Sequence, residues 1–145
     1  MTVNLLKPAF RVNDIHEFAR RQKNFYMRTE DGEILYPVRT TRRPARIDDL
    51  LNGGSVYWVV KNQISCRQEI MDIAEIPPDT PEDKAVYLFL CDPKIILTQP
   101  LPQKHFQGWR YLKPDRAPKD RGVFDENQKR PPPEMEKDLT ELGLL

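Results

Sequence analysis

The stretch Leu51-Asn-Gly-Gly-Ser-Val-Tyr-Trp-Val-Val-Lys61 decides the fold. Its second half, 55–61, is β-branched and aromatic, a composition that predicts a buried strand. The apolar residues of 46–51 lie at helical spacing, and Gly53 with Gly54 supplies the left-handed residue that ends a helix. A phosphate-binding glycine loop would follow a strand and precede a helix, whereas here the order is reversed. The two glycines therefore favour a helix end over a phosphate site.

The chain on either side predicts one longer helix and further strands. Asp14 and Glu17 have the spacing of a capping box, and the apolar face behind them predicts a helix over 14–27. Strands are predicted over 3–8, 34–39, 85–91 and 94–98. The strand 85–91 is apolar on both faces, so we expect it at the centre of the sheet.

The segment 64–76 fits two patterns, because its apolar residues match a helical face as well as strand alternation. The strand before it offers a neighbouring partner, so we expect a strand with a bulge near Met71. Pro100 and Pro102 are expected to end the strand before them. The aromatic run 105–112 is expected to form a short helical turn.

Together these elements predict an α+β fold. It is a small, mostly antiparallel sheet of about five strands, curled into a half-barrel, with two or three short helices. The folded domain is expected to span 1–113. The segment 114–133 is rich in proline and charge, which is typical of an extended or disordered linker. The apolar spacing of Met135, Leu139 and Leu142 predicts a short amphipathic helix over 134–145.

Composition argues against a membrane-spanning or disulfide-rich protein. The 145 residues carry a net charge of +1, with 39% hydrophobic and 31% charged residues, as in a single globular domain. The apolar runs 56–60 and 85–91 are far shorter than the ~20 residues of a membrane helix, and 1–10 lacks the pattern of a signal peptide. Cys66 and Cys91 form no CxxC motif and suit a reducing cytosol, where we expect them buried. We expect a cytoplasmic protein without a cofactor and without membrane association.

Residues that could carry a reaction are sparse. His16, His105 and the two cysteines show no metal-ligand spacing, so no metal site is expected. A distant cysteine–histidine nucleophile pair stays open, although buried structural thiols are the simpler interpretation. Asp48 and Asp49 fall in the first turn of a predicted helix, where negative charge offsets the helix dipole. No catalytic residue is therefore assigned.

Basic residues give the clearest functional signal. The segment 39–46 holds four arginines in eight residues and no acid, namely Arg39, Arg42, Arg43 and Arg46. A second basic stretch, 104–121, is interleaved with Phe106, Trp109 and Tyr111. Arginine forks suit phosphate oxygens, and aromatic faces stack on unpaired bases. From Gly122 onward the charge reverses, with six acids against three bases, so a near-neutral total hides a basic body.

Several signatures resemble a family of short, uncharacterised alphaproteobacterial proteins, domain-of-unknown-function family 1489. They are the stretch 51–61 quoted above, Arg67-Gln68-x-Ile70, Phe106-Gln-Gly-Trp-Arg-Tyr-Leu112 and Ala117-Pro118-x-Asp120. The resemblance covers most of residues 1–120 and leaves the stretch after Gly122 outside. It implies a small cytoplasmic bacterial protein, and it transfers no site because the family has no assigned activity.

A second resemblance is to PUA-like domains, including the EVE and ASCH groups. It rests on the order of a short helix, a glycine-terminated turn, an aromatic strand and a hairpin strand over 63–76. Those domains are small curled β-barrels that bind RNA or modified bases in a cleft. The resemblance implies that 39–46 and Arg67-Gln68 lie near such a cleft.

Three functions follow as hypotheses. The first is a non-catalytic module that binds RNA or a nucleotide. Its expected ligand-binding residues are Arg39, Arg42, Arg43, Arg46, Tyr57, Trp58, Arg67, Gln68, Trp109 and Arg110. The alternative is a protein-interaction adaptor that docks on a protein partner, or on a second copy, through 129–145. A small enzyme using Arg67, Gln68 and His105 ranks third, because no nucleophile–base pair is recognisable.

Overall fold

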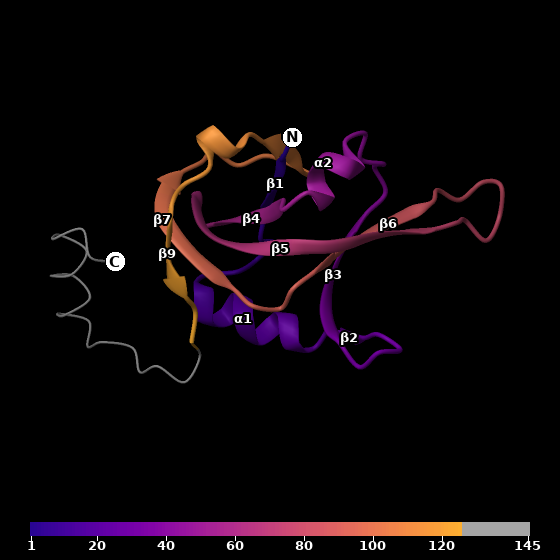
Figure 1. The fold of residues 1–145 in the computed structure, drawn as a ribbon, viewed down its shortest axis with the longest axis horizontal. Helices are drawn as coiled ribbons and strands as arrows, with labels where there is room; N and C mark the ends of the chain where they lie inside the picture. Colours follow the sequence, from indigo (N-terminus) through magenta and orange to yellow (C-terminus); the bar gives the residue numbers. More distant parts are fainter. Residues whose placement is uncertain (126–145) are drawn as a thin grey trace, which may run out of the picture.

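A computed structural model describes residues 1–125 and shows an open, curled sheet flanked by two α-helices (Figure 1). The strands are β1 Asn4–Pro8, β2 Met27–Arg28, β3 Ile34–Thr40, β4 Ser55–Val60, β5 Gln63–Ile76, β6 Val86–Cys91, β7 Ile96–Pro102, β8 Arg110–Leu112 and β9 Asp120–Val123. The helices are α1 Ile15–Lys23, α2 Ile47–Leu51 and the 3-10 turn η1 Pro114–Arg116. The predicted α+β class with a mostly antiparallel, curled sheet is confirmed.

The sheet runs in the order β2-β3-β6-β5-β4-β1-β8, while β7 pairs with the first residues of β5, Gln63 to Arg67, and with β9. The pairing of β1 with β4 is parallel and every other pairing is antiparallel. β6 lies between β3 and β5, as its two apolar faces predicted. No helix among residues 1–125 is long and apolar enough to cross a membrane.

Both helices begin and end through local contacts. The Glu17 N–H donates to Asp14 Oδ1 at 2.8 Å, so the predicted capping box does start α1. α1 ends at Lys23, four residues before the predicted end, because Met27 joins the sheet in β2 opposite Leu35. After α2, Gly53 takes a φ of 84°, the left-handed conformation expected of it.

The hairpin of β4 and β5 follows the sequence pattern closely. Lys61 and Asn62 both have positive φ, 49° and 63°, and make the two-residue turn without a glycine. β5 shifts register between Ile70 and Asp72, which confirms both the strand and the bulge predicted at Met71. Beyond the bulge, β5 continues with β6 as a long arm that projects from the rest of the molecule (Figure 1).

Three segments differ from expectation. β7 continues through Pro100 to Pro102. On the side of β9, its backbone hydrogen bonds end at Gln99, whose N–H donates to the Lys119 carbonyl. A proline beyond Gln99 therefore removes no hydrogen bond to β9 or to the loop before it. The run 105–112 is not helical, since its last residues form β8 against β1. Part of the predicted linker 114–133 carries structure, namely η1 and β9. The rest of that linker and the predicted helix 134–145 lie outside the described residues.

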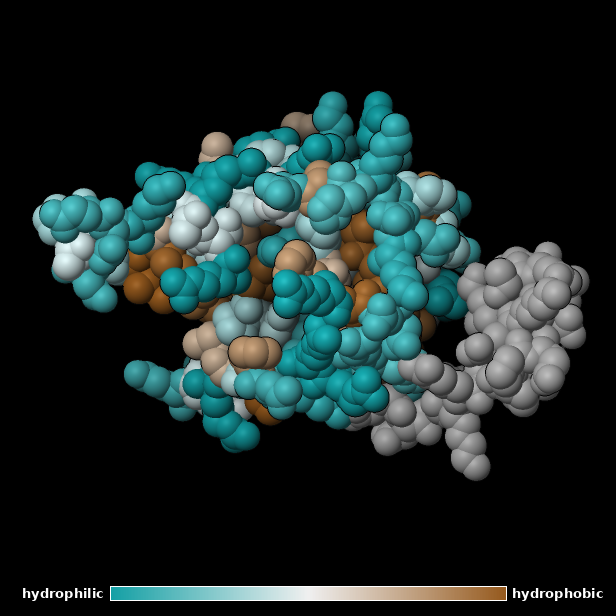
Figure 2. All heavy atoms as spheres, turned by 180° about the vertical axis from the view of Figure 1, so that it is seen from behind, coloured by the Kyte–Doolittle hydropathy of each residue, from teal (hydrophilic) through white to brown (hydrophobic). Residues whose placement is uncertain are grey.

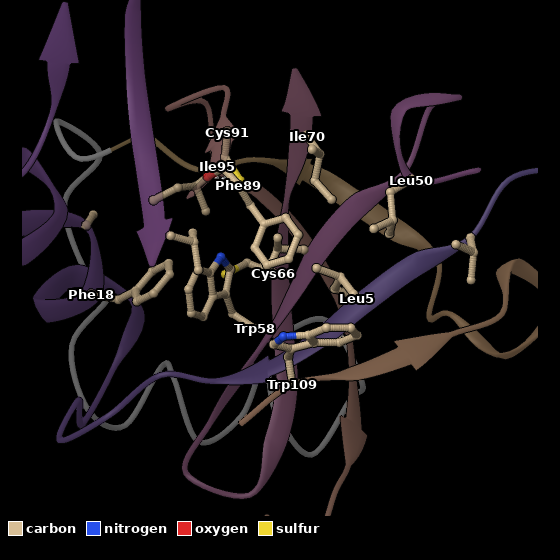
Figure 3. Packing of buried hydrophobic residues seen from close by; sticks show 14 residues of the cluster. Leu5, Phe18, Leu50, Trp58, Cys66, Ile70, Phe89, Cys91, Ile95 and Trp109 are labelled. Carbon is tan, nitrogen blue, oxygen red and sulfur yellow. Dashed lines mark hydrogen bonds between the residues drawn. The ribbon is translucent and has the colours of Figure 1, made fainter. Parts of the chain in front are cut away.

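The core lies on the concave face of the curled sheet. The Phe18 ring of α1 packs edge-on against Trp58 with a centroid distance of 5.1 Å, and Phe89 packs against Trp109 at 6.0 Å (Figure 3). Trp58 and Trp109 are 4% and 3% exposed, so both tryptophans are core residues as well as candidate binding residues. A smaller apolar cluster, which includes Tyr57, lies on the opposite face.

Candidate functional site

A cleft of about 720 Å³ opens where the curled sheet fails to close. It is bounded by the end of β1, by Trp58 of β4, by β3, by α1 and by the outer part of the β5–β6 arm at Ile76, Val86 and Leu88. In the sheet, β1 and β3 are separated by β4, β5 and β6, so the curl brings two distant strands to one hollow. The volume lies in the range of small-molecule sites.

The walls of the cleft are aromatic and aliphatic. Trp58, Phe18 and Tyr36 line its inner part, and Tyr36 lies 6.4 Å from Trp58, centroid to centroid. Phe10 and Phe25 also line it, yet they are 73% and 66% exposed. Each ring offers a face on which a ligand can stack, and the Arg11 guanidinium lies 5.1 Å from the centroid of the Phe10 ring. Apolar side chains also reach the surface near the base of the β5–β6 arm (Figure 2).

Within residues 1–125, the charged side chains that line the cleft are all cations: Lys7, Arg21 and Arg39. Arg21 is paired with Glu17 on the same helix at 2.7 Å. Lys7 is half-buried, and its ammonium lies 5.9 Å from the centroid of the Trp58 ring. Burial lowers the pKa of Lys7 below its ordinary value. The cleft therefore combines apolar walls with positive charge that no carboxylate of its lining offsets.

A buried amide network holds the floor of the cleft. Gln22 and Gln68 exchange two hydrogen bonds, each 2.8 Å long, and the Trp58 Nε1–H donates to Gln68 Oε1 at 2.9 Å. Gln22 and Gln68 are 2% and 0% exposed. Such a satisfied network fixes side-chain positions, so the Trp58 ring is held in place from behind.

Arg42 and Arg46 of the segment 39–46 contact Trp109 and Tyr111 of this chain. The Arg42 guanidinium lies 3.6 Å from the centroid of the Trp109 ring and donates to the Trp109 carbonyl. The Tyr111 hydroxyl accepts the N–H groups of Ala45 and Arg46 at 2.9 and 3.1 Å. These contacts tie the segment to β8, while Arg43 stays exposed.

Arg46 and Arg110 are also engaged locally. Arg46 pairs with Asp49 in α2 at 2.9 Å, and Arg110 lies 4.5 Å from the centroid of the Phe106 ring. Aromatic stacking leaves the charge of Arg42 and Arg110 in place, whereas the Asp49 carboxylate offsets that of Arg46. The two basic stretches, 39–46 and 104–121, therefore lie against each other at Arg42 and Arg46, and these contacts pack the arginines on aromatic rings of the chain itself.

Arg67 lies away from the cleft, because neighbouring residues of β5 point to opposite faces. Its guanidinium makes a two-pronged ion pair with Asp120, with both hydrogen bonds 2.8 Å long, and donates to Ser55 at 2.9 Å. Tyr57 lies on the same side and is 7% exposed, and burial raises the pKa of its hydroxyl. The Arg67 hydrogen bonds lower the pKa of Asp120. The polar groups of Arg67, Asp120 and Ser55 on this face of the sheet are therefore bonded to one another.

The ten predicted residues are thus divided among several places. Arg39 and Trp58 line the cleft, and Gln68 supports it through Gln22. The others lie along β8, in the segment before α2, or around Asp120. Sequence reasoning missed the cleft residues Lys7, Phe10, Arg21, Gln22, Phe25 and Tyr36. A signal existed for Gln22, which is a polar residue on the apolar face of α1.

Other candidates from the sequence find structural roles. Cys66 and Cys91 are fully buried, and burial raises the pKa of both thiols, which disfavours the reactive thiolate. Arg67, Gln68 and His105 line no common pocket among the described residues, since Arg67 and Gln68 point apart and His105 lies beside the β4–β5 turn. The adaptor hypothesis concerns 129–145, which lies outside the described residues.

The fold and the cleft define a small α+β protein with a curled, open sheet and a basic, aromatic hollow at its seam. The chain belongs to the family described as "Protein of unknown function (DUF1489)", whose model matches residues 5–145. The match includes the stretch after Gly122 that the resemblance had left outside. No curated protein and no solved structure matches the chain significantly. The PUA-like resemblance stays a prediction.

Proposed function

We propose that the cleft binds a nucleotide, either free or as an unpaired unit of RNA, without chemical turnover. The observation that best supports this proposal is the aromatic cleft, in which the charged residues of the described lining are Lys7, Arg21 and Arg39. A nucleotide combines a flat base with a phosphate, so it can use the rings and the cations at once. The exposed rings of Phe10 and Phe25 offer stacking faces, and the cations suit phosphate oxygens.

The chemistry also explains why the ligand should bind without reacting. Among the described residues, the cleft lining contains no carboxylate, histidine or cysteine that could act as a general base or a nucleophile. Its titratable side chains are lysine, arginine and tyrosine. Burial raises the pKa of Tyr36, so this hydroxyl is neutral near pH 7 and acts as a hydrogen-bonding group.

Tryptophan fluorescence can test this function, because Trp58 lines the cleft and Trp109 does not. The Trp109→Phe variant leaves Trp58 as the only tryptophan of the chain. Its emission should change on titration with the four nucleoside 5′-monophosphates or with a mixed pool of short RNA. The two arms distinguish free nucleotide from RNA.

Phosphate contacts make the affinity depend on salt. If two phosphates of a strand are neutralised, RNA affinity should fall about sevenfold between about 50 and about 200 mM salt. Absence of binding in both arms at low salt would remove the proposed function. A fluorescence change with a fatty-acid anion but with no nucleotide would equally contradict it, since apolar walls with cations would then serve another ligand.

A further inference from the structure

The cations of the cleft are not balanced. Within residues 1–125, Arg21 has its counter-ion in Glu17, whereas Lys7 and Arg39 form no ion pair. An unpaired, half-buried ammonium is costly, because burial disfavours charge. The half-buried Lys7 and the exposed Arg39 thus place two uncompensated positive charges in the cleft lining. A complementary ligand should carry about two negative charges.

We propose that the cleft selects a terminal phosphate monoester over the phosphodiester of a chain interior. This inference rests on the proposed nucleotide-binding function and deepens it. A phosphate monoester carries a charge of about −1.5 to −2 at pH 7. An internal phosphodiester carries one negative charge. The monoester thus matches Lys7 and Arg39 together, whereas a diester would leave one of the two cations uncompensated.

Lys7 is the central anchor in this arrangement. It shares the cleft lining with Arg21 of α1 and with Tyr36 and Arg39 of β3, and its ammonium lies 5.9 Å from the centroid of the Trp58 ring. The residues of β5 and β6 that line the cleft are aliphatic. Among residues 1–125, no carboxylate lines the cleft to compete for the ammonium, so the ligand anion supplies the missing counter-charge.

Arg39 and Arg21 complete the anion site in different ways. Arg39 is exposed and has no ion-pair partner among the described residues, so its planar fork is available for two phosphate oxygens. Arg21 is held by Glu17 and also lies 3.5 Å from the Phe10 carbonyl. Its charge is partly offset, and we expect it to contribute less than Lys7 or Arg39.

Matched ligands test the inference on the full chain. Nucleoside 5′-monophosphates should bind about tenfold more tightly than their phosphate methyl esters, which keep the base and lose one charge. An RNA oligonucleotide with a 5′-phosphate should exceed its 5′-hydroxyl counterpart by a similar factor. Isothermal titration calorimetry at constant ionic strength measures both ratios.

Charge-removing variants assign the preference to residues. Lys7→Gln and Arg39→Gln should each bring the ratio of the affinities for the monoester and its methyl ester close to one. Arg20→Gln on the same helix as Arg21, and Lys84→Gln in the loop before β6, remove equal charge outside the cleft lining and should leave it unchanged. Circular dichroism verifies that each variant is folded. If Lys7→Gln does not fold, Arg39→Gln still tests the preference, because Arg39 is exposed and its substitution should not disturb the core.

The outcomes separate the two proposals. Equal affinity for monoester and methyl ester, with nucleotides still bound, overturns the monoester preference and leaves the proposed function standing. A preference that survives both Lys7→Gln and Arg39→Gln, or that Arg20→Gln abolishes equally, overturns the assignment. No binding of any nucleotide or RNA overturns both.

Discussion

Gly53 and Gly54 are neighbours in the chain but are required for different reasons. Gly53 needs its left-handed φ of 84°, and space around it is open. Gly54 donates its N–H to the Leu50 carbonyl, and a Cβ there would collide with the backbone oxygens of Val3 and Leu50. Backbone atoms of a helix and a strand cannot move aside as a flexible side chain can, so the second glycine is the stricter requirement.

Substitution by alanine should therefore rank the two positions. We expect Gly54→Ala to lower the free energy of unfolding by about 3 kcal/mol, as overpacking does. Gly53→Ala should cost only about 1 kcal/mol, the price of a non-glycine residue at positive φ. Urea denaturation of both variants measures the difference, and an equal or reversed order would contradict the close-packing argument.

Gln68 shows how a single polar residue in an apolar row signals a special position. Gln68→Leu removes the partners of the Gln22 amide and of the Trp58 Nε1–H, both of which are buried. We expect a loss of about 3 kcal/mol in unfolding free energy, since each buried group left unpaired costs about 1–3 kcal/mol.

Two further variants complete the network test. Gln63→Leu, at an exposed position of the same strand, should cost close to nothing. The cost of Gln68→Leu should shrink in a Trp58→Phe background, because one of the orphaned donors is then absent. A Gln68→Leu loss no larger than that of Gln63→Leu would show that the network contributes no stability.

At the scale of elements, the ion pair of Arg67 and Asp120 ties β5 to β9 across β7, which lies between them in the sheet. Arg67 lowers the pKa of Asp120 from its ordinary 3.8, so the folded chain binds this proton less readily than the unfolded chain. The stabilisation is present above about pH 4 and is lost as the pH falls through the lowered pKa of the folded state.

Asp120→Asn should expose this contribution. Because the Asp120 side chain is 45% exposed, we expect a modest loss of about 0.5–1 kcal/mol at neutral pH. The difference between the variant and the natural chain should narrow as the pH falls to about 2. Denaturation curves across this range measure it, and a difference that is constant with pH would exclude the ion pair as its source.

Elements defined by local pattern were predicted well, and elements defined by distant partners were not. β4, β6 and the bulged β5 followed from alternation and from the neighbouring hairpin partner. The run 105–112 was wrongly expected to be helical because nothing local reveals that β8 pairs with β1, about a hundred residues earlier in the chain. Pro100 was expected to end the strand before it, yet β7 continues through Pro100 and ends at Pro102, which pairs with Gln63.

At the scale of the whole molecule, the cleft exists because the sheet curls without closing. Its lining comes from β1, α1, β3, β4 and the β5–β6 arm, and no local motif joins these segments. The sequence therefore predicted Arg39 and Trp58 as binding residues but could not place Lys7 or Phe25 beside them. Of the other arginines in 39–46, Arg42 stacks on Trp109 instead of lining the cleft.

The cost of holding Lys7 in the cleft should appear in stability as well as in binding. Burial lowers its folded-state pKa below the ordinary 10.5, so stability should rise with pH through that lowered value. Lys7→Met should therefore raise the free energy of unfolding at pH 7 by about 0.5 kcal/mol while it weakens nucleotide binding. If Lys7→Met instead has a lower free energy of unfolding than the natural chain, the prediction is wrong, and contacts of Lys7 stabilise the folded state.

The most direct test of the central claim is nuclear magnetic resonance of the ¹⁵N-labelled full chain titrated with a nucleoside 5′-monophosphate. The largest amide shifts are predicted in 7–12, in α1 and in 36–39, the backbone around the cleft. Shifts confined to 42–46 and 109–111, or no shifts with any of the four nucleotides, would contradict a nucleotide site in the cleft.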